Sequence, residues 1–105
     1  MTDTLTNLAA TIAARRSADP ASSYVAKLLA AGPPLAARKL GEEAVETVVA
    51  ALAGNAAELT AEAADLLFHL LVVLEARGVS FANVLAELER REGVSGIAEK
   101  AARSE

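Results

Sequence analysis

The chain has 105 residues, of which 53% are apolar, and a net charge of −4, so we expect a single domain over residues 1–105. The acidic balance without a basic block argues against a nucleic-acid partner, and the absence of cysteine excludes a disulfide framework. No apolar run approaches the roughly 18 residues of a membrane span and no signal-peptide pattern opens the chain, so we expect a cytoplasmic protein without a membrane partner.

Helical patterns begin early in the chain, and the abundant alanine with few aromatic side chains predicts an all-α fold. Residues 4–16 carry leucine and isoleucine at helical spacing. After a short linker, Ser22 or Ser23 is suited to cap a brief helix that ends at Gly32. Two prolines then open a third helix, of about residues 34–53, because proline is well tolerated in a first helical turn.

A second long helix follows almost at once. Asn55, with Glu58 three residues later, has the pattern of a capping box and predicts a helix over about residues 56–77. Gly78 is suited to close that helix in the left-handed conformation. Because only Gly54 and Asn55 separate the two long helices, we expect them to fold back as an antiparallel pair at the centre of a helical bundle.

The remainder of the chain suggests both a further helix and an oligomer. Ser80 is suited to cap a helix through Arg91, and residues 94–105 are expected to form a flexible tail. The stretch Leu66 to Leu74 is apolar on every side except at His69. A helix that is apolar all round is buried all round, and so short a chain offers few helices to cover it. We therefore predict a homodimer.

Two acidic pairs lie at mirrored distances from one glycine. Glu43 and Glu46 lie 11 and 8 residues before Gly54, and Glu62 and Asp65 lie 8 and 11 residues after it. Each pair has i,i+3 spacing, so its two carboxylates share a helix face. In an antiparallel hairpin the two pairs would face each other, roughly 12 to 16 Å from the turn at 1.5 Å of rise per residue.

Four carboxylates in one cleft repel one another unless a cation lies between them, and a hard divalent ion such as Mg²⁺ suits oxygen ligands. A single ExxE or ExxD pair is more often a solvated helix face. The two pairs at mirrored registers favour a metal site over that interpretation. One ion or two would polarise a phosphoryl group and acidify a water, which is a standard route to phosphoanhydride hydrolysis.

Three nearby side chains admit two interpretations each. Lys39, one turn before Glu43, suits either a plain ion pair or a phosphate contact at the rim of the cleft. His69, one turn after Asp65, suits either a satisfied core position or a contact that supports a ligand or a ribose. Tyr24 suits either core packing or stacking on a base. Spacing alone favours the structural interpretation of each.

Two segments carry a family resemblance. The run KLGEEAVE at residues 39–46 and the run EAADLLFHLLV at residues 62–72 closely resemble the phosphoribosyl-ATP pyrophosphohydrolase family, a branch of the MazG-like all-α nucleotide pyrophosphohydrolases. The ExxE and ExxD pairs are shared by the whole superfamily, whereas KxGEE and DLxxHxxV are specific to this branch. The similarity extends over about residues 22–103. Phe68 stands where the family often has tyrosine, which is a conservative difference.

The resemblance implies a MazG-like bundle that hydrolyses 1-(5-phospho-β-D-ribosyl)-ATP to the AMP derivative and pyrophosphate, the second step of histidine biosynthesis. It implies that Mg²⁺ is held by the four catalytic carboxylates, Glu43, Glu46, Glu62 and Asp65. For substrate binding we expect Lys39, Glu42, His69 and Tyr24.

Two alternatives remain at this stage. One is a MazG-like enzyme that removes noncanonical or excess nucleotides, from which only the branch-specific residues separate the chain. The other is a non-catalytic oligomerisation module with an acidic face, whose stability would be indifferent to Mg²⁺.

Overall fold

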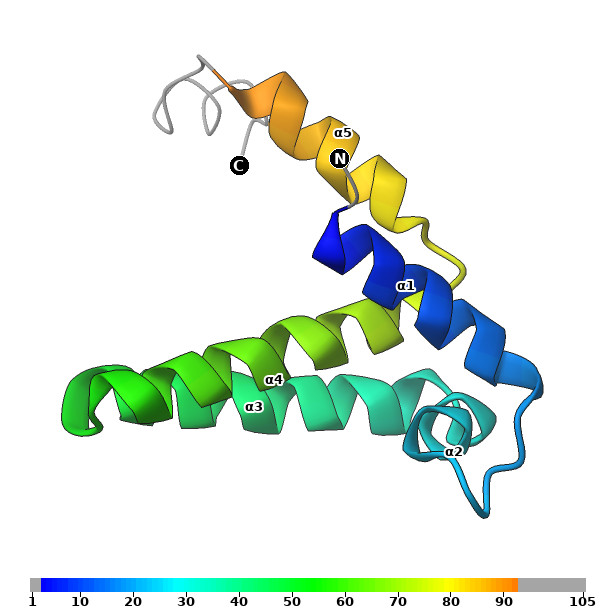
Figure 1. Cartoon of the computed structure of the whole chain (residues 1–105), viewed down its shortest axis with the longest axis horizontal. Coiled ribbons are helices and arrows are strands. Elements are labelled where there is room, and N and C mark those ends of the chain that lie inside the picture. Colours follow the sequence, from blue (N-terminus) through cyan, green and yellow to red (C-terminus); the bar gives the residue numbers. More distant parts are fainter. Residues whose placement is uncertain (1–2, 93–105) are drawn as a thin grey trace.

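Five α-helices and one short 3₁₀ turn make up the computed structural model, which describes residues 3–92 (Figure 1). The all-α prediction is confirmed, and no strand occurs within this range. None of the helices in residues 3–92 is both long enough and apolar enough to cross a bilayer. The predicted tail, residues 94–105, lies outside the described part of the chain. The helices are α1 (Thr4–Ala14), α2 (Tyr24–Ala31), α3 (Pro33–Ala53), α4 (Ala56–Ala76) and α5 (Phe81–Arg91), with the turn η1 at Arg15–Ser17.

Side-chain caps begin the helices where the sequence predicts. The side chains of Ser23, Asn55 and Ser80 each accept a hydrogen bond from a backbone N–H in the first turn of α2, α4 and α5. Gly78 follows α4 with a φ of 70°, the left-handed conformation expected of it. The helix predicted over residues 4–16 is shorter, because its last residues tighten into the 3₁₀ turn η1.

The antiparallel hairpin of α3 and α4 is the longest feature of the molecule (Figure 1). The backbone of Gly54 in the turn is extended, with a φ of −93°, a conformation that any residue can adopt. The turn requires glycine because there is no space for a side chain. A Cβ atom at Gly54 would lie 2.9 Å from the carbonyl oxygen of Ala50 and 3.0 Å from a carboxylate oxygen of Glu58. The tight turn therefore sets the register in which the two helices face each other.

The core lies at the base of this hairpin, where α1 and α2 pack against it. Its fully or nearly buried members come from four helices: Ile12, Leu28, Ala36, Leu71 and Val72. Arg16 adds a polar tie at this end, because its guanidinium donates to the Glu75 carboxylate at 2.9 Å and to the Glu75 carbonyl at 2.6 Å. These contacts anchor the base of the hairpin and leave its far end extending away from α1 (Figure 1).

The far end of the hairpin exposes a row of large apolar side chains. The large apolar side chains of α3 are only partly covered, and four of them are more than half exposed: Val45, Val48, Val49 and Leu52. As expected for so short a chain, its own helices do not cover α4 on every side between Leu66 and Leu74. Leu67 is 43% exposed, although α4 contacts α1, α2 and α3.

Candidate metal centre

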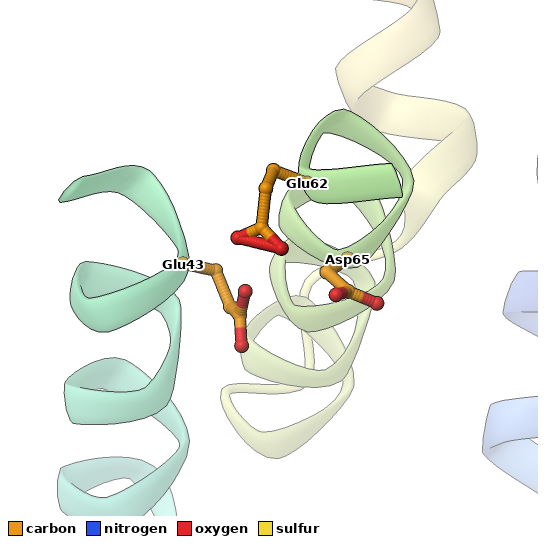
Figure 2. Close-up of side chains that lie close together, drawn as sticks. All are labelled: Glu43, Glu62 and Asp65. Carbon is orange, nitrogen blue, oxygen red and sulfur yellow. The ribbon is translucent and has the colours of Figure 1, made fainter. Parts of the chain in front are cut away.

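Three of the four predicted carboxylates converge between the long helices. Glu43 of α3 and Glu62 and Asp65 of α4 each place an oxygen within 4.8 Å of the other two. Figure 2 shows Glu43 and Glu62 extending toward each other across the space between the helices, with Asp65 beside them on α4. The fourth carboxylate, Glu46, is not a member of this close group.

The position of Glu43 follows from the heptad-like pattern of α3. Five of the buried or half-buried residues of α3 are spaced four, three, four and three apart: Ala36, Leu40, Glu43, Thr47 and Ala50. This is the spacing of a seam between two packed helices. Glu43 is therefore an acidic member of an otherwise small or uncharged interface, and Glu62 approaches it from α4.

Burial and like charge make this cluster electrostatically unfavourable when it holds no cation. Glu43 Oε2 and Glu62 Oε2 are buried and have no hydrogen-bond partner among residues 3–92. Burial raises the pKa of Glu43; a side-chain hydrogen bond that its protonated form donates to Glu46, and the charges of Glu46 and Asp65, raise it further. Burial raises the pKa of Glu62 as well, and the charges of Glu46 and Asp65 add to it. Either a proton or a cation would relieve the repulsion.

Glu46 is exposed but electrostatically part of the cluster. It acts on the pKa of both Glu43 and Glu62, one from each helix. Together with Glu62 it lines a hollow of about 470 Å³ between α3 and α4, walled on one side by Val45 and Val49. The hollow lies beside the converging carboxylates, so a ligand seated there would be adjacent to them.

The remaining predicted residues of α3 lie at the edge of the cluster. Lys39 Nζ is 3.6 Å from Glu42 Oε1, and the Arg38 guanidinium is 3.8 Å from the same carboxylate. Lys39 therefore pairs with Glu42 and not with Glu43, the partner that i,i+4 spacing suggested. Such exposed pairs contribute little to stability and are easily exchanged for a ligand. Glu42 also lines a shallow hollow with Glu46.

Tyr24 and His69 are joined to each other and to the cluster. The Asp65 carbonyl lies 2.8 Å from His69 Nδ1 and can only accept, so in the neutral imidazole this nitrogen carries the proton. Nε2 then accepts from the Tyr24 hydroxyl at 2.9 Å. The Tyr24 ring also lies against Phe68, with centroids 6.3 Å apart. His69 is buried, whereas Tyr24 remains 49% exposed.

Sequence reasoning missed Thr47, which follows Glu43 by one helical turn. Its hydroxyl lies 2.8 Å from the Glu43 carbonyl and 3.2 Å from the Glu62 carbonyl. A threonine bonded to the carbonyl four residues earlier is ordinary in a helix. A signal was available in the seam spacing, which points the side chain at α4, but the second acceptor depends on how closely the helices approach.

The donor set suits a hard divalent cation. All the converging ligands are carboxylate oxygens, and two of those oxygens are buried without a hydrogen bond. Mg²⁺ and Ca²⁺ prefer such ligands, while the absence of sulfur and the involvement of both His69 nitrogens in other bonds disfavour zinc. Glu43, Glu62 and Asp65 could hold the ion, with Glu46 at the open side.

Comparison with known proteins points in the same direction. The profile of a family described as phosphoribosyl-ATP pyrophosphohydrolase matches residues 5–92. A phosphoribosyl-ATP pyrophosphatase of Rhizorhabdus wittichii is 68% identical over 103 residues, which covers 98% of this chain and 97% of that protein. Proteins of the same name from Erythrobacter litoralis and Novosphingobium aromaticivorans are each 65% identical, over 98% and 95% of this chain and 99% and 94% of their own lengths.

Proposed function

The chain belongs to the phosphoribosyl-ATP pyrophosphohydrolase family, and from this premise we propose that it hydrolyses 1-(5-phospho-β-D-ribosyl)-ATP. One water adds across the α-β phosphoanhydride, and the products are the phosphoribosyl-AMP derivative and pyrophosphate, as in the second step of histidine biosynthesis. The observation that carries the proposal is the convergence of carboxylates from both helices with two buried, unpaired oxygens. The substrate is a small, highly charged metabolite that does not cross membranes, so we place the enzyme in the cytoplasm.

We propose that Glu43, Glu46, Glu62 and Asp65 are the catalytic carboxylates and hold Mg²⁺. When bound, the ion supplies Lewis-acid polarisation of a phosphoryl oxygen and lowers the pKa of a water. The protein side chains contribute position and charge. Glu43 and Glu62 approach from opposite helices, so they set the width of the site. Glu46, exposed beside the hollow, lies where the polyphosphate would enter.

The substrate would be bound at the rim by Lys39, Glu42, Tyr24 and His69. Lys39 is held near the cluster only by a long surface ion pair with Glu42, so its ammonium is free to turn to a phosphate. The half-exposed ring of Tyr24 offers a stacking face. His69 orients that ring through the hydroxyl and is itself held by the Asp65 carbonyl.

The deciding experiment measures pyrophosphate release from phosphoribosyl-ATP and from a panel of ordinary nucleoside triphosphates, with and without Mg²⁺. We expect a clear preference for the phosphoribosyl substrate and dependence on the ion. Equal rates on all triphosphates would instead indicate a general nucleotide pyrophosphohydrolase.

Lys39→Gln should raise KM by about tenfold with little change in kcat, because loss of one charged phosphate contact affects binding. Arg38→Gln, which removes the other cation paired with Glu42, is the matched control.

We also propose that the chain forms a homodimer through the far end of the hairpin. Four large apolar side chains of α3 are exposed there, and Leu52 is 84% exposed. An apolar row of this kind on a single chain is typical of a surface covered by another protein. The site borders this row, since Val45 and Val49 wall the hollow that contains Glu46.

Leu52→Asp should convert the dimer to monomer in sedimentation velocity at micromolar concentration, because burying the new carboxylate in an apolar interface is costly. Thr11→Asp, an added charge on the exposed side of α1, should leave the dimer intact. A monomeric wild-type chain, or a dimer unaffected by Leu52→Asp, would remove this proposal.

A further inference from the structure

Thr47 links the two helices at the height of the carboxylate cluster. Its hydroxyl lies 2.8 Å from the carbonyl oxygen of Glu43, on its own helix, and 3.2 Å from that of Glu62, on the opposite helix. These two residues are the ones whose carboxylates extend toward each other across the hairpin (Figure 2). One side chain thus bonds to the backbone of a carboxylate residue on each side of the site.

The second of these bonds is the unusual one. A carbonyl oxygen only accepts, and a hydroxyl has a single proton, so the proton of Thr47 is shared between the two carbonyls. Two other threonines of the described chain show the ordinary arrangement. Thr60 Oγ1 lies 2.8 Å from the carbonyl of Ala56, and Thr11 Oγ1 lies 3.1 Å from that of Asn7, each four residues earlier. The hydrogen bonds of these two hydroxyls stay within one helix.

The cross-helix bond is possible because α3 and α4 approach closely at this point. A threonine side chain is short, so its oxygen reaches a backbone carbonyl of α4 only if the two backbones are near each other. Ala50, the next seam residue of α3, is 7% exposed and offers only a methyl group to the interface. The spacing of the helices here is therefore governed by small residues and by the Thr47 hydroxyl.

We propose that Thr47 is a positioning residue that fixes the relative height of Glu43 and Glu62 and so sets the geometry of the metal site. This inference rests on the proposed function, because it assigns Thr47 a role in cation binding and turnover. Glu43 and Glu62 belong to different helices, and their buried oxygens have no hydrogen bond of their own among residues 3–92. Their separation is thus determined by the backbone, and Thr47 is the side chain that bonds to both backbones.

The alternative is that Thr47 only stabilises the hairpin. The two roles make different predictions, because a small slide of α4 along α3 would leave the fold intact while moving ligand oxygens apart. Misplacement of about 1 Å at a catalytic site costs up to about a hundredfold in rate. A purely structural bond would lower the melting temperature and leave cation affinity unchanged.

The test compares Thr47→Val, which keeps the shape and removes the hydroxyl, with Thr47→Ser, which keeps the hydroxyl. Mg²⁺ binding is measured by calorimetry with the metal alone, without substrate, and kcat and KM are measured at saturating Mg²⁺. We expect Thr47→Val to weaken Mg²⁺ affinity by about tenfold, the usual effect of removing a group that orients a ligand. Its kcat should fall more than its KM rises, and Thr47→Ser should stay within about twofold of the wild type.

Thr60→Val is the matched control, because it removes a hydroxyl bonded four residues back on α4 without touching the opposite helix. It should leave Mg²⁺ affinity unchanged. Thr47→Ala repeats the test with a smaller side chain if the valine variant loses its helical circular dichroism. Wild-type Mg²⁺ affinity in a folded Thr47→Val or Thr47→Ala protein overturns the inference alone, while a wild-type chain that binds no Mg²⁺ overturns the metal proposal as well.

Discussion

Replacing Glu62 with glutamine is expected to abolish pyrophosphate release and leave the helical fold intact. Glu62 contributes one of the three converging ligand atoms, and its Oε2 is buried without a hydrogen-bond partner among residues 3–92. Glutamine has nearly the same shape but lacks the charge that would hold a cation. We expect kcat to fall by more than about a hundredfold, since changes to groups that merely support a metal ligand already cost 10 to 100-fold. Pyrophosphate release at saturating Mg²⁺ measures the effect, and far-ultraviolet circular dichroism checks the fold.

Glu89→Gln makes the same chemical change on an exposed position of α5, away from the carboxylates. It should retain full activity, which separates the loss of a specific ligand from a general change of charge. An active Glu62→Gln enzyme would exclude Glu62 from the metal site. Charge reversal at Glu62 that proves harmless to both turnover and stability would favour a non-catalytic oligomerisation module.

Local signals in the sequence were sufficient for the helices and for the hairpin. A serine or asparagine cap and a nearby glycine specify helix ends through short-range bonds, and those bonds occur at Ser23, Asn55 and Ser80. The burial of α3 was harder to predict. Its apolar residues show that a partner is needed, but periodicity does not identify the partner. The seam toward α4 is made largely of small and polar residues, and Val48 and Leu52 are left exposed.

The sequence predicted only those parts of the site that depend on the distance of a residue from the hairpin turn. Mirrored spacing about Gly54 placed Glu43, Glu62 and Asp65 together, because in a hairpin sequence distance from the turn becomes height along it. The bonds of the supporting side chains depend on tertiary distances. The seam spacing points Thr47 toward α4, but it does not show that the hydroxyl reaches the Glu62 carbonyl there. The hydrogen bond between Tyr24 and His69 joins residues 45 positions apart, so no local pattern reports it.

A divalent cation should stabilise the wild-type protein and not the Glu62→Gln variant, and without a cation the order of stability should reverse. The pKa values of Glu43 and Glu62 are raised in the folded state, so the folded chain holds these protons at higher pH than the unfolded chain does. Their contribution is therefore favourable below about 4.5 and is lost as the pH rises through the raised values. At pH 7 in a chelator, Glu62→Gln removes one repelling charge and should melt a few degrees higher than the wild type. At pH 4.5 the difference should shrink.

Mg²⁺ should then reverse that order by binding only the intact carboxylate cluster. At a hundredfold excess over Kd the cation adds about 2.7 kcal/mol, which is more than about 10 °C in the melting temperature of a domain of this size. Melting curves in a chelator, in MgCl₂ and in NaCl of equal ionic strength separate binding from screening. Some carboxylates have a lowered pKa in the folded state, such as Glu87, whose pKa Arg90 and Arg91 lower to about 2. Their contribution to the pH dependence of stability is the same in both proteins, so it cancels when the two are compared at each pH. Equal responses to Mg²⁺ in wild type and Glu62→Gln would show that the ion binds elsewhere and that the carboxylate repulsion is relieved by another means.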